Sequence, residues 1–318
     1  MKKVKYCLLP LLLLILVSCA TTGNEKHQEK NLWSAYDNLS YGAAKEQYVN
    51  MTIPKTVHGK TNAIVFIHGY NGGKMENWTF LNHYRKDFIV ANVNYRAIST
   101  AQNNLTMQDL LTDVDSAVSI IKHNADDNGI AINKVIVIGH SLGGFLALNY
   151  SYRQFDKDPP IPIAFCVSMS GLSDFADVHW INLARNPFNW WMNIDTILLL
   201  TSSLTGQTIT KKDISDFGFT GPVVQYIKEI SPRYSITDGI PPTIIVHDAN
   251  DNIVPYSNST GLQGALDAVH APNVFIGAST NLGHCLGAAY FGPTRNIDAS
   301  LKKEMIQAID RYIELYGD

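Results

Sequence analysis

The chain has few of the residues that cross-link a small protein or hold a metal in it. Its 318 residues include only four cysteines, no two of which form a Cys-x-x-Cys pair. The ten histidines include no His-x-x-x-His pair. These absences argue against a disulfide framework and against a metal site of the usual spacing. We therefore expect the protein to need no metal or other cofactor.

The chain also lacks an excess of charge of one sign. Twenty-five basic residues stand against 28 acidic ones, and the formal net charge is -3 with no long basic run. A nucleic acid is thus not expected as a partner, nor is membrane binding through a charged patch. The length suits one large α/β domain with a sizeable core, and the oligomeric state is left open.

A targeting segment opens the chain. Three lysines within the first five residues precede an apolar run, Leu8 to Val17, that is too short to span a bilayer. The next residues, Leu16-Val17-Ser18-Cys19, resemble a bacterial lipobox, in which the cysteine is lipidated and begins the mature chain. The alternative is an ordinary signal peptide cleaved after Ala20. The lipobox predicts a signal peptide at 1–18, a polar tether at 19–38 and a folded domain at 39–318.

The predicted lipid on Cys19 would attach the protein to a membrane of the cell envelope and leave the domain outside the cytoplasm. The residue after the cysteine is Ala20 rather than aspartate. By the sorting rule of bacterial lipoproteins, this favours the outer membrane if the cell has one.

One hexapeptide indicates chemistry. Gly139-His140-Ser141-Leu142-Gly143-Gly144 follows the β-branched run 134–138 and precedes the apolar run 145–148. A serine between glycines at a strand-to-helix turn is typical of a nucleophile elbow, because only very small neighbours let the strained turn close. The alternative is a glycine-rich turn that only packs a helix on a sheet.

Alternation of strands and helices predicts the fold class. Near-continuous apolar runs, typical of strands buried on both faces, occur at 63–67, 88–94, 134–138, 163–169, 243–247 and 273–277. Residues 32–54 read as a polar stretch followed by short antiparallel edge strands. Helical spacing and a capping motif at Thr106 predict a helix that stops at Asn128, and a second helix closes at Gly317. The pattern predicts an α/β fold with a mostly parallel central sheet flanked by helices.

The connection from Ser173 to Pro241 is too long for a plain crossover, so we expect an inserted cap at about 175–235, before the strand at 243–247. The cap contains Trp180, Trp190 and Trp191. These rings are candidates for substrate contact, and the alternative is that they form the core of the cap.

Further polar residues follow the later strands. Asp248 and Asp251 come after one of them, and His284 lies in a loop after the last. A serine hydroxyl needs an imidazole to take its proton, and the imidazole needs a carboxylate to fix its tautomer. Ser141 and His284 with one of the two aspartates can fill these roles.

These residues make the chain resemble the α/β-hydrolase superfamily, and within it the bacterial acetyl-esterase and lipase-like carboxylesterases. The resemblance implies a serine carboxylesterase that works through an acyl-enzyme. It favours Asp251 as the acid, because 251–255 resembles the Asp-x-x-Val-Pro motif, although Asp248 replaces the usual glycine. The oxyanion hole would consist of the backbone N–H groups of Leu142 and Tyr70, with Gly69 or Asn71 as a further donor. The usual His-Gly-Gly-Gly is here His-Gly-Tyr-Asn.

The resemblance also bears on the substrate. It implies a small-molecule, lipid or glycan ester. His140, next to the candidate nucleophile, is a candidate for contact with that substrate, and the alternative is that His140 is a structural residue beside the pocket. Two other functions stay open. One is a serine peptidase of the prolyl-oligopeptidase type, which the absence of a propeller-sized N-terminal region disfavours. The other is a catalytically silent binding lipoprotein with the hydrolase fold, which would have no need of a strained elbow.

Overall fold

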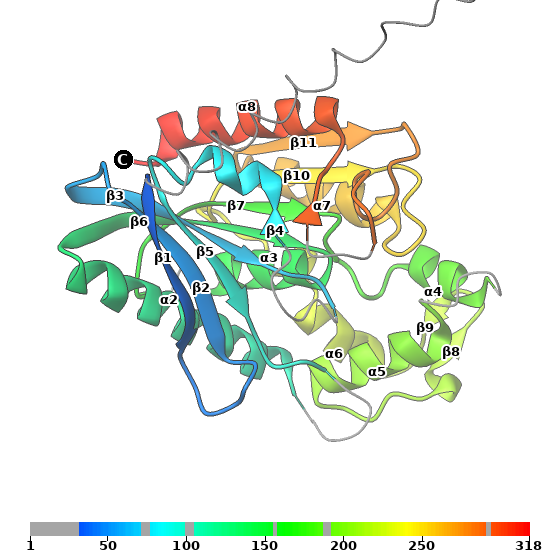
Figure 1. The fold of residues 1–318 in the computed structure, drawn as a ribbon. Coiled ribbons are helices and arrows are strands. Elements are labelled where there is room, and N and C mark those ends of the chain that lie inside the picture. Colours follow the sequence, from blue (N-terminus) through cyan, green and yellow to red (C-terminus); the bar gives the residue numbers. More distant parts are fainter. Residues whose placement is uncertain (1–31, 71–76, 99–104, 155–157, 187–191, 291–293) are drawn as a thin grey trace, which may run out of the picture.

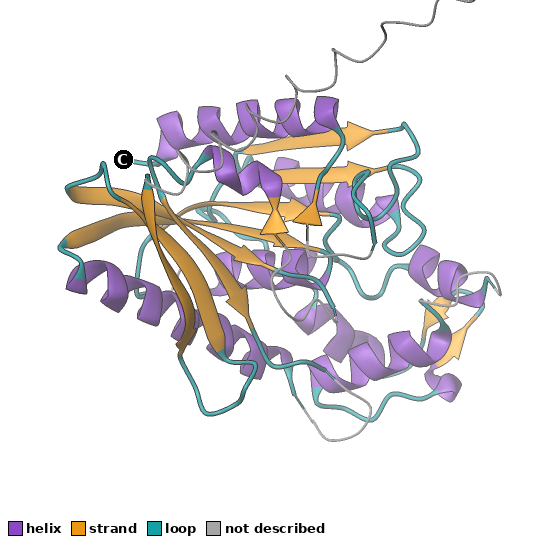
Figure 2. Ribbon diagram, viewed as in Figure 1, coloured by secondary structure: helices purple, strands orange, loops and turns teal. Residues whose placement is uncertain are grey.

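A computed structural model describes residues 32–70, 77–98, 105–154, 158–186, 192–290 and 294–318, and these form an eight-stranded sheet flanked by helices (Figures 1 and 2). The strand order is β1-β2-β5-β3-β6-β7-β10-β11. The pairs β1–β2 and β2–β5 are antiparallel, and every later pair is parallel. The carboxyl ends of the parallel strands therefore meet at one edge.

The six sheet strands that have a parallel neighbour lie where the apolar runs predict them, with shifts of up to four residues at their ends, and the first two strands lie within the stretch 32–54. Their bounds are β1 Trp33–Ser40, β2 Tyr48–Pro54, β3 Gly59–Ile67, β5 Ile89–Asn94, β6 Ile130–His140, β7 Ile163–Met169, β10 Thr243–Asp248 and β11 Asn273–Ala278. The short strands are β4 Asn77–Trp78, β8 Ile214–Ser215, β9 Gly218–Phe219 and β12 Thr294–Arg295. The helices are α2 Met107–Asp127, α3 Leu142–Gln154, α4 Val178–Arg185, α5 Ile194–Thr205, α6 Val223–Ile230, α7 Tyr256–Ala268 and α8 Ala299–Tyr316, with 3₁₀ turns η1 Thr79–His83, η3 Lys211–Asp213 and η4 Pro232–Ser235.

Two hydrophobic cores cover the two faces of the sheet. Successive side chains of a strand point to opposite faces, so Val65 joins one core and Phe66 the other. The first core holds the buried sides of α2, α3 and α7 and continues into the cap. The second core holds α8 and η1, with α8 lying along the sheet as Figure 1 shows. Burial on both faces explains why the central strands read as continuous apolar runs.

Helix α2 begins at the predicted capping motif. The side chain of Thr106 accepts a hydrogen bond from the backbone N–H of Asp109, whose carboxylate accepts one from the backbone N–H of Thr106. Hydrogen bonds from Thr106 lower the pKa of Asp109. The predicted stripe Leu110, Val114, Ala117, Val118 and Ile121 is fully buried. A capped N-terminus and an apolar stripe specify this helix locally.

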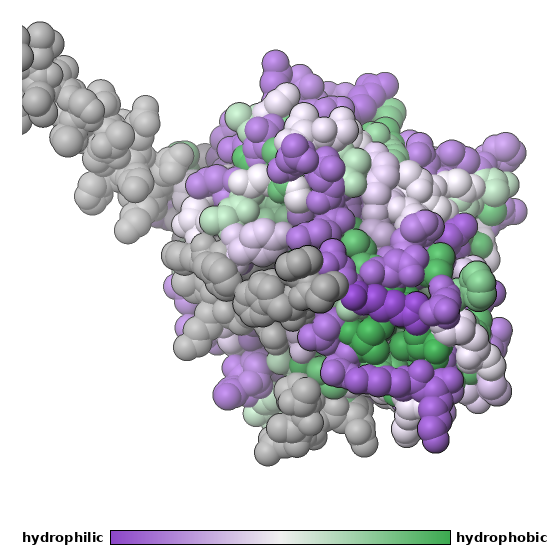
Figure 3. Space-filling model, turned by 90° about the vertical axis from the view of Figure 1, so that its right-hand side faces the viewer, coloured by the Kyte–Doolittle hydropathy of each residue, from purple (hydrophilic) through white to green (hydrophobic). Residues whose placement is uncertain are grey.

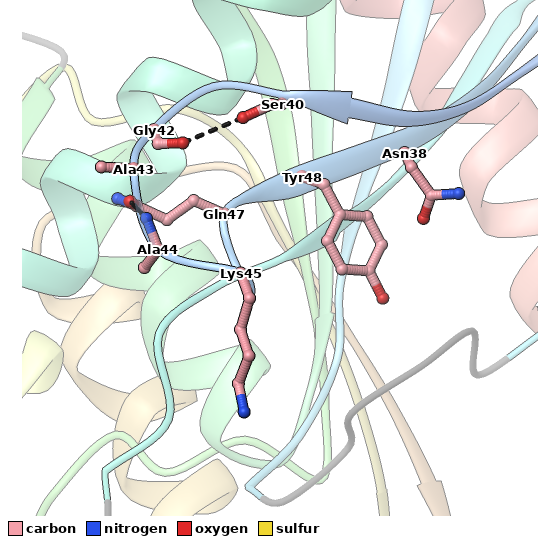
Figure 4. A pocket seen from close by; sticks show the side chains of 8 residues that line it. All are labelled: Asn38, Ser40, Gly42, Ala43, Ala44, Lys45, Gln47 and Tyr48. Atoms are coloured by element: carbon pink, nitrogen blue, oxygen red, sulfur yellow. Dashed lines mark hydrogen bonds between the residues drawn. The ribbon is translucent and has the colours of Figure 1, made fainter.

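The folded domain begins earlier than the predicted boundary at residue 39. Strand β1 starts at Trp33, which pairs with Pro54 of β2. Residues 33–38, predicted as tether, thus belong to the sheet, because pairing with β2 satisfies their backbone groups despite their polar side chains. The connection from β1 to β2 carries a pocket of about 520 Å³ whose lining includes Lys45 and Tyr48 (Figure 4).

The insertion between β7 and β10 forms the cap. It contains α4, α5, α6 and the β8–β9 hairpin, grouped together beyond the carboxyl ends of the parallel strands in Figure 1. Its two connections to the sheet are joined, since the N–H of Phe175 donates to the hydroxyl of Ser231, and the N–H of Arg233 donates to the carbonyl of Ser173. Within the described ranges, no helix has the length and apolarity needed to cross a membrane.

Candidate active site

Ser141 lies at a sharp turn between β6 and α3. Its φ is +57°, a left-handed conformation that a serine adopts only at a cost in free energy. A Cβ on Gly139 would lie 2.0 Å from the carbonyl oxygen of Gly143, and a Cβ on Gly143 would lie 2.1 Å from that of Ile67. The glycines are therefore required for the turn to close. This geometry is that of a nucleophile elbow.

The structure brings Ser141, His284 and Asp251 together from three separate loops. His284 Nε2 lies 2.9 Å from Ser141 Oγ, and His284 Nδ1 lies 2.8 Å from Asp251 Oδ2. All three residues are buried. The carboxylate can only accept, so Nδ1 carries a proton, and in the neutral ring Nε2 accepts the hydroxyl proton of Ser141. This is the tautomer that a general base for the serine requires.

Backbone donors hold the carboxylate of Asp251 in place. Its Oδ1 accepts hydrogen bonds from the N–H groups of Ile253 and Val254, at 2.8 and 3.0 Å. Burial would by itself raise the pKa of Asp251, but its interactions with His284 and His247 outweigh burial and lower the pKa well below its usual range. Asp251 is therefore ionised at neutral pH and faces the imidazole of His284.

Asp248, the other candidate acid, has a different position. Its Oδ1 accepts from the N–H groups of Asn250 and Gly283, at 2.9 and 3.2 Å, and its Oδ2 accepts from Thr280 at 3.3 Å. Asp248 thus ties the end of β10 to the loop that carries His284. The residue that replaces the usual glycine orders this loop and does not contact the imidazole.

The predicted oxyanion loop packs against the nucleophile. A Cβ on Gly69 would lie 3.1 Å from Ser141 Cβ and 3.3 Å from the carbonyl oxygen of His140. Tyr70 is the next residue, while Asn71 lies outside the described residues. Leu142 is the first residue of α3, so its N–H belongs to the first turn, whose N–H groups have no partner within the helix. Leu142 thus follows Ser141 in the chain, and Tyr70 follows the glycine that packs against Ser141.

The remaining predicted contacts have different outcomes. His140 donates from Nε2 to the carbonyl of His284 at 2.9 Å, so it supports the loop of the base. Trp180 is fully buried and packs its ring on Phe175, with centroids 4.9 Å apart. It belongs to the core of the cap, and the prediction that it contacts substrate is corrected. Trp190, Trp191 and Cys19 lie outside the described residues.

The sequence analysis missed His247 as a site residue. It is fully buried on β10, and its Nε2 lies 3.0 Å from Asp251 Oδ2. The carboxylate oxygen that accepts a hydrogen bond from His284 therefore accepts a second one from His247. A histidine four residues before the acid was the available signal, but a short apolar strand gives no clue to which way such a ring points.

An open cleft of about 580 Å³ lies between α4 and the start of α7. Its lining comprises His179, Asn182, Leu183, Asn186, Asp251, Pro255, Tyr256, Ser257 and Thr260. Because Asp251 is among these residues, the cleft adjoins the acid loop. In the part of the chain that the structure describes, no group of three or more His, Cys, Asp and Glu side chains could hold a metal ion.

Comparison with models of known protein families shows which family this chain matches. The model of the BD-FAE family matches residues 49–266, more than half of the chain. This protein belongs to the BD-FAE family. The matched region runs from β2 into α7, and so includes the elbow, the cap and the acid loop of this BD-FAE protein.

Solved structures share the α/β-hydrolase fold with this BD-FAE protein. A truncated carbohydrate esterase from gut microbiota has a TM-score of 0.63 and 18% identity, covering 89% of this chain and 98% of the other. Esterase B from Lactobacillus rhamnosis has a TM-score of 0.61 and 14% identity, covering 93% and 94%. The predicted fold class is confirmed.

A relative found by sequence similarity aligns with a smaller part of this chain than the solved structures do. The uncharacterized protein YfhR of Salmonella typhimurium is 22% identical over 205 residues, or 63% of this chain. The chain spans 57% of the length of that relative.

Proposed function

We propose that the protein is a serine hydrolase that cleaves carboxylic esters through an acyl-enzyme. The hydrogen-bonded chain from Ser141 through His284 to Asp251 carries this proposal. The esterases among its structural neighbours support it as an analogy of fold.

The reaction begins with attack of Ser141 Oγ on the ester carbonyl while His284 takes the hydroxyl proton. The backbone N–H groups of Leu142 and Tyr70 stabilise the oxyanion, and removing one such donor typically costs about 3 kcal/mol of transition-state stabilisation. His284 then protonates the departing alcohol. Water activated by the same imidazole cleaves the acyl-enzyme and releases the acid.

The substrate consists of an acyl group and an alcohol, and the described surface offers a place for each. The face onto which the parallel strands open carries a cluster of hydrophobic residues between hydrophilic bands, which suits an acyl chain (Figure 3). The cleft beside the acid loop offers Asn182, Ser257 and Thr260, which suit an alcohol with several hydroxyl groups. The substrate is therefore a small-molecule, lipid or glycan ester, and the lipid on Cys19 holds the enzyme at a membrane.

Labelling with a fluorophosphonate tests the nucleophile without knowledge of the substrate. We expect the wild type to be labelled at Ser141 and Ser141→Ala to lose both labelling and hydrolysis of nitrophenyl acetate while keeping its fold. Nitrophenyl esters of rising chain length and an aminoacyl anilide test the substrate class in the same assay. Equal labelling of Ser141→Ala would exclude Ser141 as the nucleophile, and preferred cleavage of the anilide would favour a peptidase.

A further inference from the structure

His247 is a buried titratable residue that the proposed reaction does not use. Its Nε2 lies 3.0 Å from Asp251 Oδ2 and 3.2 Å from the carbonyl oxygen of Val254. Both of these oxygens are acceptors, so Nε2 carries a proton and donates to them. His247 therefore holds the acid through a defined N–H group.

Ser259 of α7 holds the other side of the same ring. Its Oγ lies 2.6 Å from His247 Nδ1, and both side chains are buried. With the proton on Nε2, Nδ1 of the neutral ring accepts the hydroxyl proton of Ser259. The ring is thus fixed at both nitrogens, as is typical of a histidine whose tautomer matters.

We propose that His247 is a positioning residue for the acid, which, with Ser259, orients Asp251 Oδ2 toward His284 and shares its negative charge. This inference rests on the proposed function. It extends the hydrogen-bonded chain to five side chains, in the order Ser141, His284, Asp251, His247 and Ser259.

The sharing of charge has a consequence for pH dependence. Without the His247 donor, the backbone N–H groups of Ile253 and Val254 still hold Oδ1, so the carboxylate stays beside His284 while its Oδ2 is oriented less firmly. Its Oδ2 then faces His284 alone, which stabilises the imidazolium form of His284. Activity requires the neutral base, so the acid limb of the pH–rate profile moves to higher pH.

Several other titratable or aromatic groups face these five hydrogen-bonded side chains, and the variants described below leave them unchanged. The His140 ring lies 4.9 Å from the His284 ring, and the Tyr256 ring lies 5.6 Å from that of His247. Tyr290 interacts electrostatically with Asp251 and Cys285, and burial raises its pKa to about 12. Asp248 contacts the loop before His284 through Gly283.

The test compares His247→Leu, which removes the donor, with His247→Gln, whose amide N–H replaces it. The readout is the second-order rate of fluorophosphonate labelling of the full chain between pH 5 and 9. We expect the acid limb of His247→Leu to move up by about one pH unit and that of His247→Gln to stay near the wild type. Ser259→Ala should move the acid limb in the same direction by less. Gln263→Ala, one turn farther along α7 and outside the site, should leave it unchanged.

A slower rate with an unmoved acid limb in both His247→Leu and Ser259→Ala would overturn the proposal, because a purely structural role lowers the rate alone. If His247→Leu does not fold, Ser259→Ala decides by itself. NMR of ¹⁵N-labelled histidines in the wild type requires no turnover, and we expect His247 protonated at Nε2 and unprotonated at Nδ1. The reverse tautomer would overturn the proposal even if labelling succeeds, whereas an unlabelled wild type would instead refute the proposed function.

Discussion

The Cα of Gly143 lies so close to the carbonyl oxygen of Ile67 that a Cβ would come within 2.1 Å of it. Helix α3 therefore begins in direct backbone contact with the end of β3, the strand that leads to the oxyanion loop. The position of the nucleophile and the position of the oxyanion loop depend on the same contact.

Gly143→Ala is expected to lower the free energy of unfolding by about 3 kcal/mol or more, since rigid backbone must move to admit the methyl group. Urea unfolding measures this change. Gly264→Ala is the matched control, because a Cβ at that position in α7 meets nothing within 4 Å and alanine favours a helix. Equal stability of the two variants would contradict the close contact.

Asp251→Asn is expected to reduce kcat by several orders of magnitude, because an amide favours the wrong imidazole tautomer. Asp248→Asn removes charge from a residue that only orders the loop of His284, so its loss should be far smaller. Rates with nitrophenyl acetate at saturating substrate check the difference. The reverse order of the two effects would assign the acid to Asp248.

Acid should destabilise the protein through Asp251. Its pKa is lower in the folded state than in the unfolded chain, so its ionised form contributes stability above about pH 4, and that contribution is lost as the pH falls further. Urea unfolding between pH 3 and 6 should show a steeper loss in the wild type than in Asp251→Asn. Asp238→Asn, at an exposed position, serves as the control. Parallel slopes in the wild type and Asp251→Asn would contradict this prediction.

Trp180→Ala should cost about 3 to 5 kcal/mol, because it removes a fully buried ring from the core of the cap. Phe217→Ala should cost little, since Phe217 is 90% exposed between β8 and β9. Thermal unfolding measures both. Trp180→Phe should leave the dependence of kcat/KM on acyl length unchanged. A shift of the optimal acyl length at unchanged stability would instead indicate that Trp180 contacts the substrate.

Cys19→Ser should prevent acylation and either block processing of the precursor or release a protein without lipid. Mass spectrometry of the mature N-terminus and detergent partitioning check this prediction. A wild-type N-terminus at Thr21 without lipid would instead demonstrate an ordinary signal peptide.

Local patterns were sufficient for much of the fold and for two site residues. Buried parallel strands require continuous apolar runs, and α2 requires a cap and an apolar stripe, so both features are visible in short windows of sequence. The elbow could be predicted for the same reason, because the glycines that let the turn at Ser141 close without a steric clash all lie within one hexapeptide. His284 followed from its place in a loop after the last strand.

Contacts between distant segments decided the rest. Asp248 and Asp251 follow the same strand, and only the turn after β10 directs one carboxylate toward His284 and the other toward Gly283. The ring of His247 acquires its role from α7, and the first strand of the sheet exists because β2 pairs with it. The sequence by itself determined which residues could perform the chemistry. The tertiary structure decided which of them meet, because hydrogen bonds of 3 Å between side chains far apart in the chain depend on packing that no local pattern contains.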